Sequence, residues 1–522
     1  MASNIQRIPT EILLQIFQIY KSQKCEDSTQ HLFHLSLVCR PWRDFIQRCP
    51  ALWSDMWLDV STGKVEQQAA YQLERAGRTL LSLAIMFPWQ HTVKERGEQG
   101  SAEPLPVRLA NTLRNTMVRW ESFRMHARPY EAQLFLDNCA GYTPNLSTII
   151  IKSRYVDRNT FPPTLSIPFQ RPVEAKRGPP ITTSFRSILP VWSSLGTNVT
   201  EIQIDFTEVR LRAAQFVALL LSCPNLVQLT VTGAYDLTID NISDPVLVPL
   251  PYLTDLRVSH IREPEYLIGV LRLQALQSLC IDEFEWSPAM GGILQNIFQT
   301  CNSLEKAEIL PGDGGLEIYE DTFAQERIVL PSLKDLSLSA EATMYPLLQR
   351  LSLPQLISAS FFDIDGPPPD STRKITLPSL LSLELHGSTT FLHYVDAPNL
   401  VELDLVEETR STGADPLRSL IEGPRPSLRS LWLDIRGLTD RDIIRCLELL
   451  PFLEELEICN CTVSDETLRA LAKPPPSIWL AVIQKGLVPR LKSATFVCTH
   501  ITDEGFATLV ASRPAVDWKC ID

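Results

Sequence analysis

Residues 378–385 read PSLLSLEL, and residues 398–405 repeat the same phrase as PNLVELDL. Both follow the pattern Pro-x-Leu-x-x-Leu-x-Leu. In the final x-Leu-x-Leu the side chains alternate, so that the leucines share one face of a short strand and the polar residues share the other. One such strand cannot bury its apolar face alone. The phrase therefore predicts a small unit that stacks against copies of itself.

Further copies of the phrase occur along most of the chain, about fifteen in all, at a spacing of roughly 20 to 29 residues. The clear copies begin at Pro224, Pro251, Pro331, Pro378, Pro398, Pro426 and Pro451. The weaker copies begin at Leu80, Trp120, Leu146, Val199, Leu276, Leu304, Leu356 and Leu491. This regular return predicts an array of repeats.

Helical stretches lie between many copies, for example at residues 212–222, 290–299 and 441–450. Near the C-terminus, Thr439, Ser464 and Thr502 each precede an acidic residue, which is typical of a helix N-cap. The array resembles leucine-rich repeat proteins. The resemblance implies an α/β fold, a curved solenoid with parallel strands on its concave side and helices on its convex side. Residues 88–106 and the proline-rich residues 161–190 are predicted to be loop excursions from this array.

The N-terminal stretch, residues 5–58, has a different pattern. Apolar residues at Ile8, Ile12 and Ile16 recur at helical spacing, and Pro9 occupies a first-turn position where its missing N–H costs nothing. A second apolar set between residues 32 and 46 continues until Pro50 interrupts it. We expect three short helices. A unit this small buries too little surface to be robust alone, so it needs a neighbour or a partner.

The order of residues in this stretch resembles the F-box. That resemblance implies docking on a Skp-type adaptor, which links to a cullin RING ubiquitin ligase. The polar residues 21–30 depart from the family pattern and are expected to lengthen the link between the first two helices. The predicted adaptor-binding residues are Ile8, Pro9, Glu11, Ile12, Leu13, Ile16, Phe17, Leu35, Val38, Cys39 and Trp42.

The charge balance of the chain bears on which partners it can bind. The formal net charge is -13, and residues 301–470 hold 29 acidic against 14 basic residues, a difference of -15. This balance disfavours nucleic acid binding and is compatible with a basic protein partner for the second half of the chain, but a solvated acidic surface without a partner is at least an equal alternative. With no secretory leader and no long apolar run, we expect an intracellular protein, cytoplasmic or nuclear, without membrane contact.

Motifs for catalysis or cofactor binding are missing. The sequence contains no GxSxG, no HExxH and no dinucleotide fingerprint, and its eight histidines are dispersed. We therefore expect neither an enzyme nor a cofactor. Dispersed Ser, His and Asp residues still converge in some hydrolases, so a hydrolase hidden in the array stays a rival hypothesis.

Residues beside the strand leucines are predicted to line the concave face. In the first strands these include Arg124, His126 and Lys152. Trp432 either forms a contact point for a partner or packs against its neighbours. The predicted substrate-binding residues are Phe362, His386, Glu402, Asp404, Trp432, Asp434, Glu455 and Glu457.

The full prediction is an F-box domain at residues 1–58 followed by a leucine-rich repeat domain at residues 59–522. By resemblance, the first part would dock on the adaptor and the second would recruit a substrate for ubiquitin transfer by other subunits. The alternative is an interaction scaffold that binds the adaptor but joins no ligase.

Overall fold

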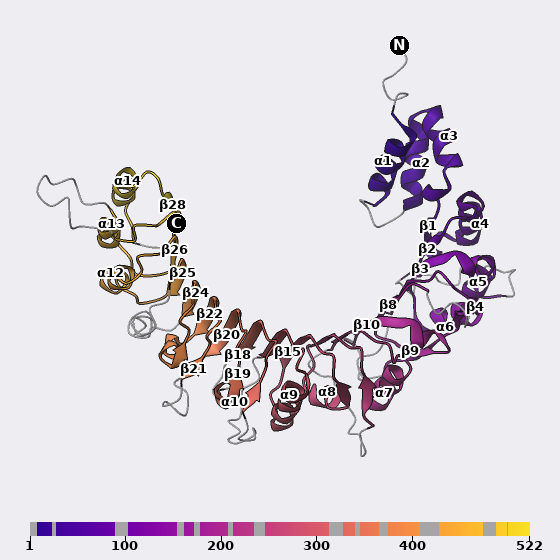
Figure 1. Ribbon diagram of the computed structural model, residues 1–522. Helices are drawn as coiled ribbons and strands as arrows, with labels where there is room; N and C mark the ends of the chain where they lie inside the picture. Colours follow the sequence, from indigo (N-terminus) through magenta and orange to yellow (C-terminus); the bar gives the residue numbers. More distant parts are fainter. Residues whose placement is uncertain are drawn as a thin grey trace, which may run out of the picture. The chain divides into compact units, whose positions relative to one another are not determined.

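The computed structural model describes residues 8–22, 28–88, 103–153, 161–171, 178–206, 212–233, 246–312, 327–339, 345–364, 374–407, 427–472, 487–497 and 500–521. The chain forms two compact units, Met1–Arg272 and Leu273–Asp522. In each unit parallel strands lie beside one another and helices lie on one side of them (Figure 1). This is the repeat solenoid that the sequence predicts.

The first unit begins with the three predicted helices, α1 (Thr10–Ser22), α2 (Ser28–Val38) and α3 (Arg40–Arg48), followed by the 3-10 turn η2 (Pro50–Leu52). Phe17 is fully buried at their centre. Its ring centroid lies 4.9 Å from that of Trp42 and 5.8 Å from that of Phe45. The edge-to-face geometry of these aromatic contacts is favourable, so α1 and α3 share one small core.

The polar residues 21–30 do not form the long link that the sequence suggested. Helix α1 continues to Ser22 and α2 begins at Ser28, so the helices take up half of this stretch. Residues 23–27, between the helices, lie outside the described residues.

The sheet of the first unit runs in the order β1–β2–β3–β5–β8–β10–β11–β13, with every pair parallel. Its strands are β1 (Asp55–Asp59), β2 (Leu81–Met86), β3 (Trp120–His126), β5 (Thr148–Lys152), β8 (Ile181–Arg186), β10 (Val199–Asp205), β11 (Gln228–Thr232) and β13 (Asp255–Ser259). The helices of this unit after the N-terminal three are α4 (Val65–Ala76), α5 (Leu105–Leu113), α6 (Pro129–Asp137), α7 (Ala213–Leu221) and α8 (Glu265–Ile268).

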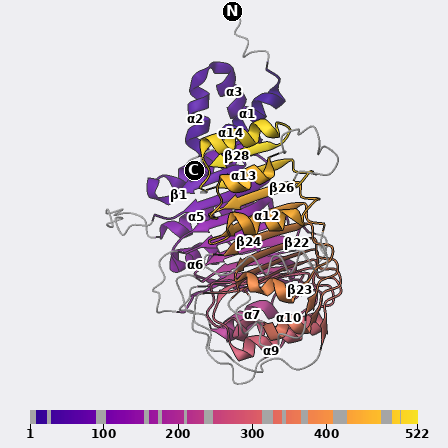
Figure 2. The ribbon, with the colours of Figure 1, turned by 90° about the vertical axis from the view of Figure 1, so that its left-hand side faces the viewer.

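The second unit continues the same design, and its later strands and helices are seen side by side in Figure 2. Its parallel strands, in spatial order, are β15 (Ser278–Phe284), β16 (Lys306–Pro311), β18 (Asp335–Ser339), β20 (Ser358–Ile364), β22 (Ser382–Gly387), β24 (Glu402–Glu407), β25 (Ser430–Ile435), β26 (Glu455–Cys459), β27 (Ser493–Val497) and β28 (Asp517–Ile521). Its helices are α9 (Pro288–Thr300), α10 (Tyr345–Arg350), α12 (Asp440–Glu448), α13 (Asp465–Leu471) and α14 (Asp503–Ser512).

Smaller elements fill the connections. Short parallel pairs stand apart from the main sheet: β4 (Gly141–Tyr142) with β7 (Phe169–Gln170), β6 (Thr164–Ile167) with β9 (Leu189–Trp192), β12 (Val248–Leu250) with β14 (Leu271–Leu273), β17 (Ile328–Val329) with β19 (Leu351–Ser352), and β21 (Ile375–Thr376) with β23 (Val395–Asp396). The 3-10 turns are η3 (Val60–Thr62), η4 (Arg114–Arg119), η5 (Leu195–Asn198) and η6 (Thr389–Tyr394).

The leucines of the repeated phrase form continuous buried columns. Leu383 and Leu385 are 1% and 2% exposed, and they pair in register with the equally buried Leu403 and Leu405 of the next strand. Each buried leucine stabilises the fold by roughly 1.5–3 kcal/mol relative to an exposed one. The intervening side chains, such as Glu384, lie on the opposite face, which is open because the helices lie on the leucine side.

Three carboxyl-terminal repeats are also joined through their helix N-caps. The Asp440 carboxylate accepts hydrogen bonds from the backbone N–H and hydroxyl of both Ser464 and Thr467, at 2.6–3.1 Å. Asp465 accepts from the N–H and hydroxyl of Thr502, at 2.9 and 2.7 Å. Two of the three predicted cap residues, Ser464 and Thr502, therefore also bind the acidic residue of the preceding repeat, whereas Thr439 bonds Asp442 of its own helix.

Of the eighteen main-sheet strands formed by the described residues, fifteen coincide with predicted copies of the phrase, and three do not: β1, β8 and β28. The prediction of a loop excursion at residues 161–190 is wrong in part, because β8 lies in the sheet between β5 and β10. Its inward side chains are Ile181, Thr183 and Phe185, which bury well without any leucine. Of the excursion predicted at residues 88–106, residues 89–102 lie outside the described residues, and α5 begins at Leu105.

Candidate interaction surfaces

Helix α1 places a row of apolar side chains in solvent. Ile12, Ile16 and Ile19 are 45%, 43% and 58% exposed. Spacings of four and three residues put them on one face of the helix, opposite the buried Phe17. Pro9 and Glu11, at the start of this helix, are also exposed.

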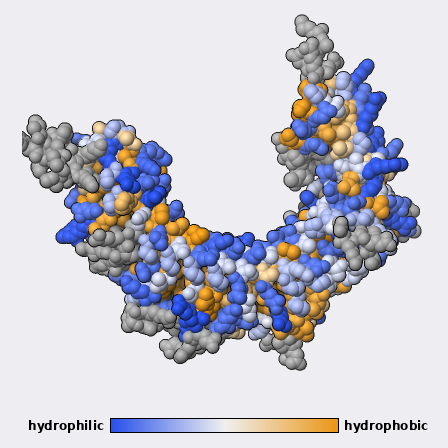
Figure 3. All heavy atoms as spheres, viewed as in Figure 1, coloured by the Kyte–Doolittle hydropathy of each residue, from blue (hydrophilic) through white to orange (hydrophobic). Residues whose placement is uncertain are grey.

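Helix α2 contacts α1 and exposes a second apolar row. Phe33, Leu37 and Val38 are 62%, 58% and 58% exposed, whereas Leu32 is buried. Figure 3 shows hydrophobic side chains on the surface of these N-terminal helices. Large exposed apolar side chains gathered on one small domain are typical of a protein contact site. We call this set the N-terminal patch: Ile12, Ile16, Ile19, Phe33, Leu37 and Val38.

The predicted adaptor-binding residues divide by exposure. Pro9, Glu11, Ile12, Ile16 and Val38 are exposed, and Ile8, Leu13, Leu35, Cys39 and Trp42 are half-buried. Phe17 is completely buried, so the structure assigns it to the core of the domain and not to a contact surface.

Three residues of the patch were missed from the sequence: Ile19, Phe33 and Leu37. Ile19 continues the helical spacing of Ile12 and Ile16, so the sequence pattern could have predicted it. Helix α2 has apolar residues around much of its circumference, so periodicity alone does not show which of them are exposed.

The second surface lies on the open face of strands β20 to β27. Glu384, Asp404, Trp432 and Glu457 occupy equivalent positions on four adjacent strands. Glu402 and Glu455 lie one row earlier, and Asp434 lies one row later. Neighbouring strands are about 4.8 Å apart, so these carboxylates lie close together. We call the following set the acidic face: Glu384, Glu402, Asp404, Asp434, Glu455 and Glu457.

A hydrogen-bonded cluster fixes one end of this surface. The Ser360 hydroxyl donates to Glu384 Oε2 at 2.8 Å, and His386 Nε2 lies 2.8 Å from Glu384 Oε1. The ring of Phe362 lies against the His386 imidazole, with centroids 4.8 Å apart. Burial alone would raise the pKa of Glu384, but the hydrogen bonds from His386 and Ser360 lower it overall.

Asp404 has the opposite shift. The pKa of its carboxyl is raised from 3.8 to about 6, mainly by burial and in part by nearby carboxylates, and the His386 imidazole partly opposes this rise. These neighbouring carboxylates belong to Glu384, Glu402 and Glu457. A positive group brought to this position would relieve the repulsion between these carboxylates.

Trp432 lies half-buried between Asp404 and Glu457 in the same row. The two carboxylate oxygens of Asp434 each accept a hydrogen bond from the Asn460 amide, at 3.0 Å. All eight predicted substrate-binding residues therefore lie on the open face, in three adjoining rows. Their role in binding stays a prediction.

The Ser360, Glu384 and His386 cluster does not have the arrangement of a catalytic triad. In a triad, the imidazole lies between the hydroxyl and the carboxylate, so that it can take the hydroxyl proton. Here the carboxylate lies between the other two groups. Within the described residues, no group of three His, Cys, Asp or Glu side chains is placed to hold a metal ion.

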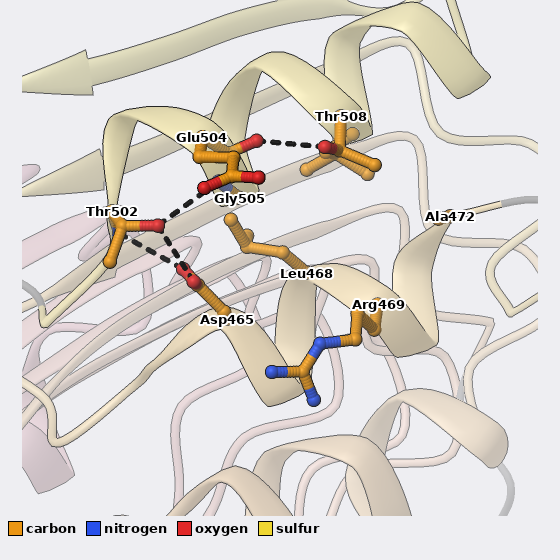
Figure 4. Close-up of a pocket in the computed structure, with 9 residues that line it drawn as sticks. Asp465, Leu468, Arg469, Ala472, Thr502, Glu504, Gly505 and Thr508 are labelled. Carbon is orange, nitrogen blue, oxygen red and sulfur yellow. Dashed lines mark hydrogen bonds between the residues drawn. The ribbon is translucent and has the colours of Figure 1, made fainter.

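A cavity of about 230 Å³ opens on the helix side, between α13 and α14 (Figure 4). Asp465, Arg469, Thr502 and Thr508 contribute polar groups to its lining. Asp465 already accepts hydrogen bonds from Thr502, as described above.

The helices of the described residues include none with the length and apolar character needed to cross a bilayer.

In a comparison with protein families, the family model described as F-box-like matches residues 5–59, about a tenth of the chain. A search of the curated proteins finds no significant match.

Among solved structures, an internalin (inlF) from Listeria monocytogenes is similar at 13% identity and a TM-score of 0.32, over 62% of this chain and 80% of that one. A chain of the Rad7 and Elc1 complex in yeast is similar at 14% identity and a TM-score of 0.28, over 99% of this chain and 98% of that one. The N-terminal match and the repeated parallel strands together show that the chain consists of an F-box-like domain followed by a leucine-rich repeat array.

Proposed function

We propose that the chain is the substrate-recognition subunit of an SCF-type cullin RING ubiquitin ligase. The observation that carries this proposal is the N-terminal patch, which an F-box-like domain exposes on α1 and α2. A Skp-type adaptor is the partner that this family implies. Covering an isoleucine or a phenylalanine of the patch would contribute roughly 1.5–3 kcal/mol per side chain.

The docking domain is joined firmly to the first strands of the array, within the first unit. Trp53 is 6% exposed, and its indole Nε1 donates to the carbonyl of Ile46 at 2.7 Å. Its ring contacts that of Tyr71 on α4, and the Arg75 guanidinium lies 3.6 Å from the Tyr71 ring centroid. The predicted boundary at residues 58 and 59 falls within β1, so we propose that the two domains share this strand.

A rigid junction suits a subunit whose role is to hold a bound target at a fixed place in the complex. Ubiquitin transfer requires that a target lysine stay near the charged conjugating enzyme, and a fixed geometry raises its effective concentration there. In this proposal the chain supplies no catalytic group or cofactor, and other subunits carry out the transfer. Its place of action would be the cytoplasm or the nucleus.

The acidic face supports the second half of the proposal, the binding of a basic protein target. Two of its six carboxylates, those of Asp404 and Glu457, flank Trp432 on the adjacent strands, and Phe362 and His386 lie at one edge of the face. Arginine or lysine side chains of a target would pair with the carboxylates, and the indole would provide an apolar contact.

A pull-down with purified Skp-type adaptor tests the docking step. The wild-type chain is expected to retain the adaptor, and the double variant Pro9→Ala with Ile12→Asp is expected to lose it, because a charge replaces an apolar contact. Tyr130→Asp is the matched control, since Tyr130 is 71% exposed and lies on α6, outside the F-box-like domain. Equal capture of the adaptor by both variants would contradict the docking role.

The alternative function is an interaction scaffold that binds the adaptor without joining a ligase. The same apolar patch would serve it, so the two functions differ in whether a cullin is present. Cullin that co-purifies with the wild-type complex and is lost in the double variant supports the ligase subunit. Adaptor capture without cullin supports the scaffold.

A further inference from the structure

On three adjacent strands of the first unit, β3, β5 and β8, the open face differs in charge from the acidic face of the second unit, whereas the next strand, β10, adds Glu201 and Asp205 to the open face. Strands β3, β5 and β8 each place three side chains on this face. These nine residues include two arginines, one lysine and one histidine, and they include no carboxylate. They are Ser122, Arg124 and His126 on β3, Thr148, Ile150 and Lys152 on β5, and Thr182, Ser184 and Arg186 on β8.

The nitrogen-bearing side chains are in register. His126 pairs with Lys152, and Lys152 pairs with Arg186, so the three form one row across adjacent strands. With strands about 4.8 Å apart, Lys152 lies between two side chains that can donate hydrogen bonds to the same anionic group. Arg124 lies one row behind His126 on the same face and is exposed. We call these four residues the basic face.

The positive charge of this row is only partly neutralised. Arg186 forms an ion pair with Asp205 of β10, at 3.4 Å. Among the described residues, none forms an ion pair with Lys152 or Arg124. The array therefore holds two cationic groups on a sheet face without a described counter-ion, in a protein whose net charge is -13.

We propose that the basic face, formed by Arg124, His126, Lys152 and Arg186, binds an acidic segment of the target protein, rich in Asp and Glu. The proposal rests on the proposed function only in taking the open face as the target-binding surface. The guanidinium groups of Arg124 and Arg186 match carboxylates in shape, and Lys152 adds a mobile charge between them.

A protein segment suits this face better than a nucleic acid. Three permanent positive charges neutralise few phosphates, and nonspecific nucleic acid binding draws on many such contacts. The strongly acidic chain as a whole would repel a polyanion at long range, whereas a short acidic segment meets mainly the local charge.

The test measures binding of labelled peptides to the full-length chain by fluorescence anisotropy. The probes are a peptide of alternating Glu and Ser, its Gln-for-Glu counterpart, and a single-stranded DNA of the same length. Lys152→Glu is the test variant, and Lys152→Gln removes the charge without reversing it. Lys64→Glu is the matched control, because Lys64 is exposed on the helix side, before α4 in the same unit.

The Glu peptide is expected to bind the wild type at least tenfold more tightly than the Gln peptide. Lys152→Glu should weaken this binding at least tenfold, Lys152→Gln should weaken it less, and Lys64→Glu should leave it within twofold. Equal binding of the two peptides, equal effects of Lys152→Glu and Lys64→Glu, or tighter binding of DNA than of the Glu peptide would overturn the proposal.

The adaptor pull-down is run on the same variants and separates the two proposals. Lys152→Glu should keep the adaptor, because the basic face and the N-terminal patch are formed by different elements of the unit. Peptide binding without adaptor binding in the wild type would remove the ligase function and leave the acidic-segment site standing.

Discussion

Asp404→Asn is predicted to stabilise the second unit at neutral pH. The wild-type carboxyl is half-buried on β24, and its neighbours Glu384, Glu402 and Glu457 are all acidic. Its pKa of about 6 in the folded chain exceeds the ordinary value of 3.8. Asparagine has nearly the same shape and no charge, so the substitution removes the repulsion and keeps the packing.

The size and pH dependence of the effect follow from linkage. Between pH 4 and pH 6 the folded chain binds more protons at this carboxyl than the unfolded chain does. Stability therefore falls as pH rises through this window, and the loss is complete above it. A difference of about two pKa units corresponds to at most ~3 kcal/mol, which solvent screening at a half-buried site lowers to about 1–2 kcal/mol.

Urea unfolding, followed by tryptophan fluorescence, measures this effect, because Trp432 lies on the adjacent strand. Asp404→Asn should raise the free energy of unfolding at pH 7.5, and the gain should vanish at pH 4. Glu455→Gln is the control, since it removes an exposed carboxylate two strands away, where surface charge pairs contribute little. A gain that is equal at both pH values, or no gain at pH 7.5, would refute the reasoning.

Three further substitutions test other parts of the structure, each by its free energy of unfolding in urea. Asp440→Ala leaves the hydrogen-bond donors of Ser464 and Thr467 without their acceptor and should lower the free energy of unfolding by about 2–3 kcal/mol. Because these hydrogen bonds lower the pKa of Asp440, the difference between variant and wild type should shrink as pH falls below 4. Gly505→Ala brings a Cβ to 2.3 Å from Asp465 Oδ1 and should cost about 1–3 kcal/mol despite the better helix propensity of alanine; Gly292→Ala, with nothing within 4 Å, is its control. Trp53→Ala leaves a cavity between the F-box-like domain and the array and should lower the free energy of unfolding by about 3–5 kcal/mol. It also removes the hydrogen bond to Ile46, so α3 should become less ordered and adaptor affinity should fall.

Most of the array could be predicted because the repeated sequence pattern indicates both where a strand lies and which of its side chains are buried. Pro-x-Leu-x-x-Leu-x-Leu located β22, β24, β25 and other strands, and their in-register pairing follows from aligning the phrases. Strands β1, β8 and β28 lack the phrase. In β8, isoleucine, threonine and phenylalanine fill the inward positions, and the prolines before it favoured a loop. Any side chain of suitable size can occupy a buried column, so a leucine pattern misses such strands.

The candidate surfaces were predictable to different degrees. Strand alternation was enough to place Asp404 and Trp432 on the open face, because a strand has only two faces. It did not predict the raised pKa of Asp404, which arises from burial and from the alignment of carboxylates on neighbouring strands. In the helical domain, Phe17 matched the motif but lies in the core, because helix faces are assigned by packing with other helices.

The central claim is that the N-terminal patch docks a Skp-type adaptor, and titration calorimetry with purified adaptor tests it most directly. Ile16→Asp should weaken binding at least 100-fold, since it removes an apolar contact and buries a charge, whereas Tyr130→Asp should leave the affinity within twofold. Folded wild-type protein that binds no adaptor, or an Ile16→Asp variant that binds as tightly as the wild type, would contradict the account.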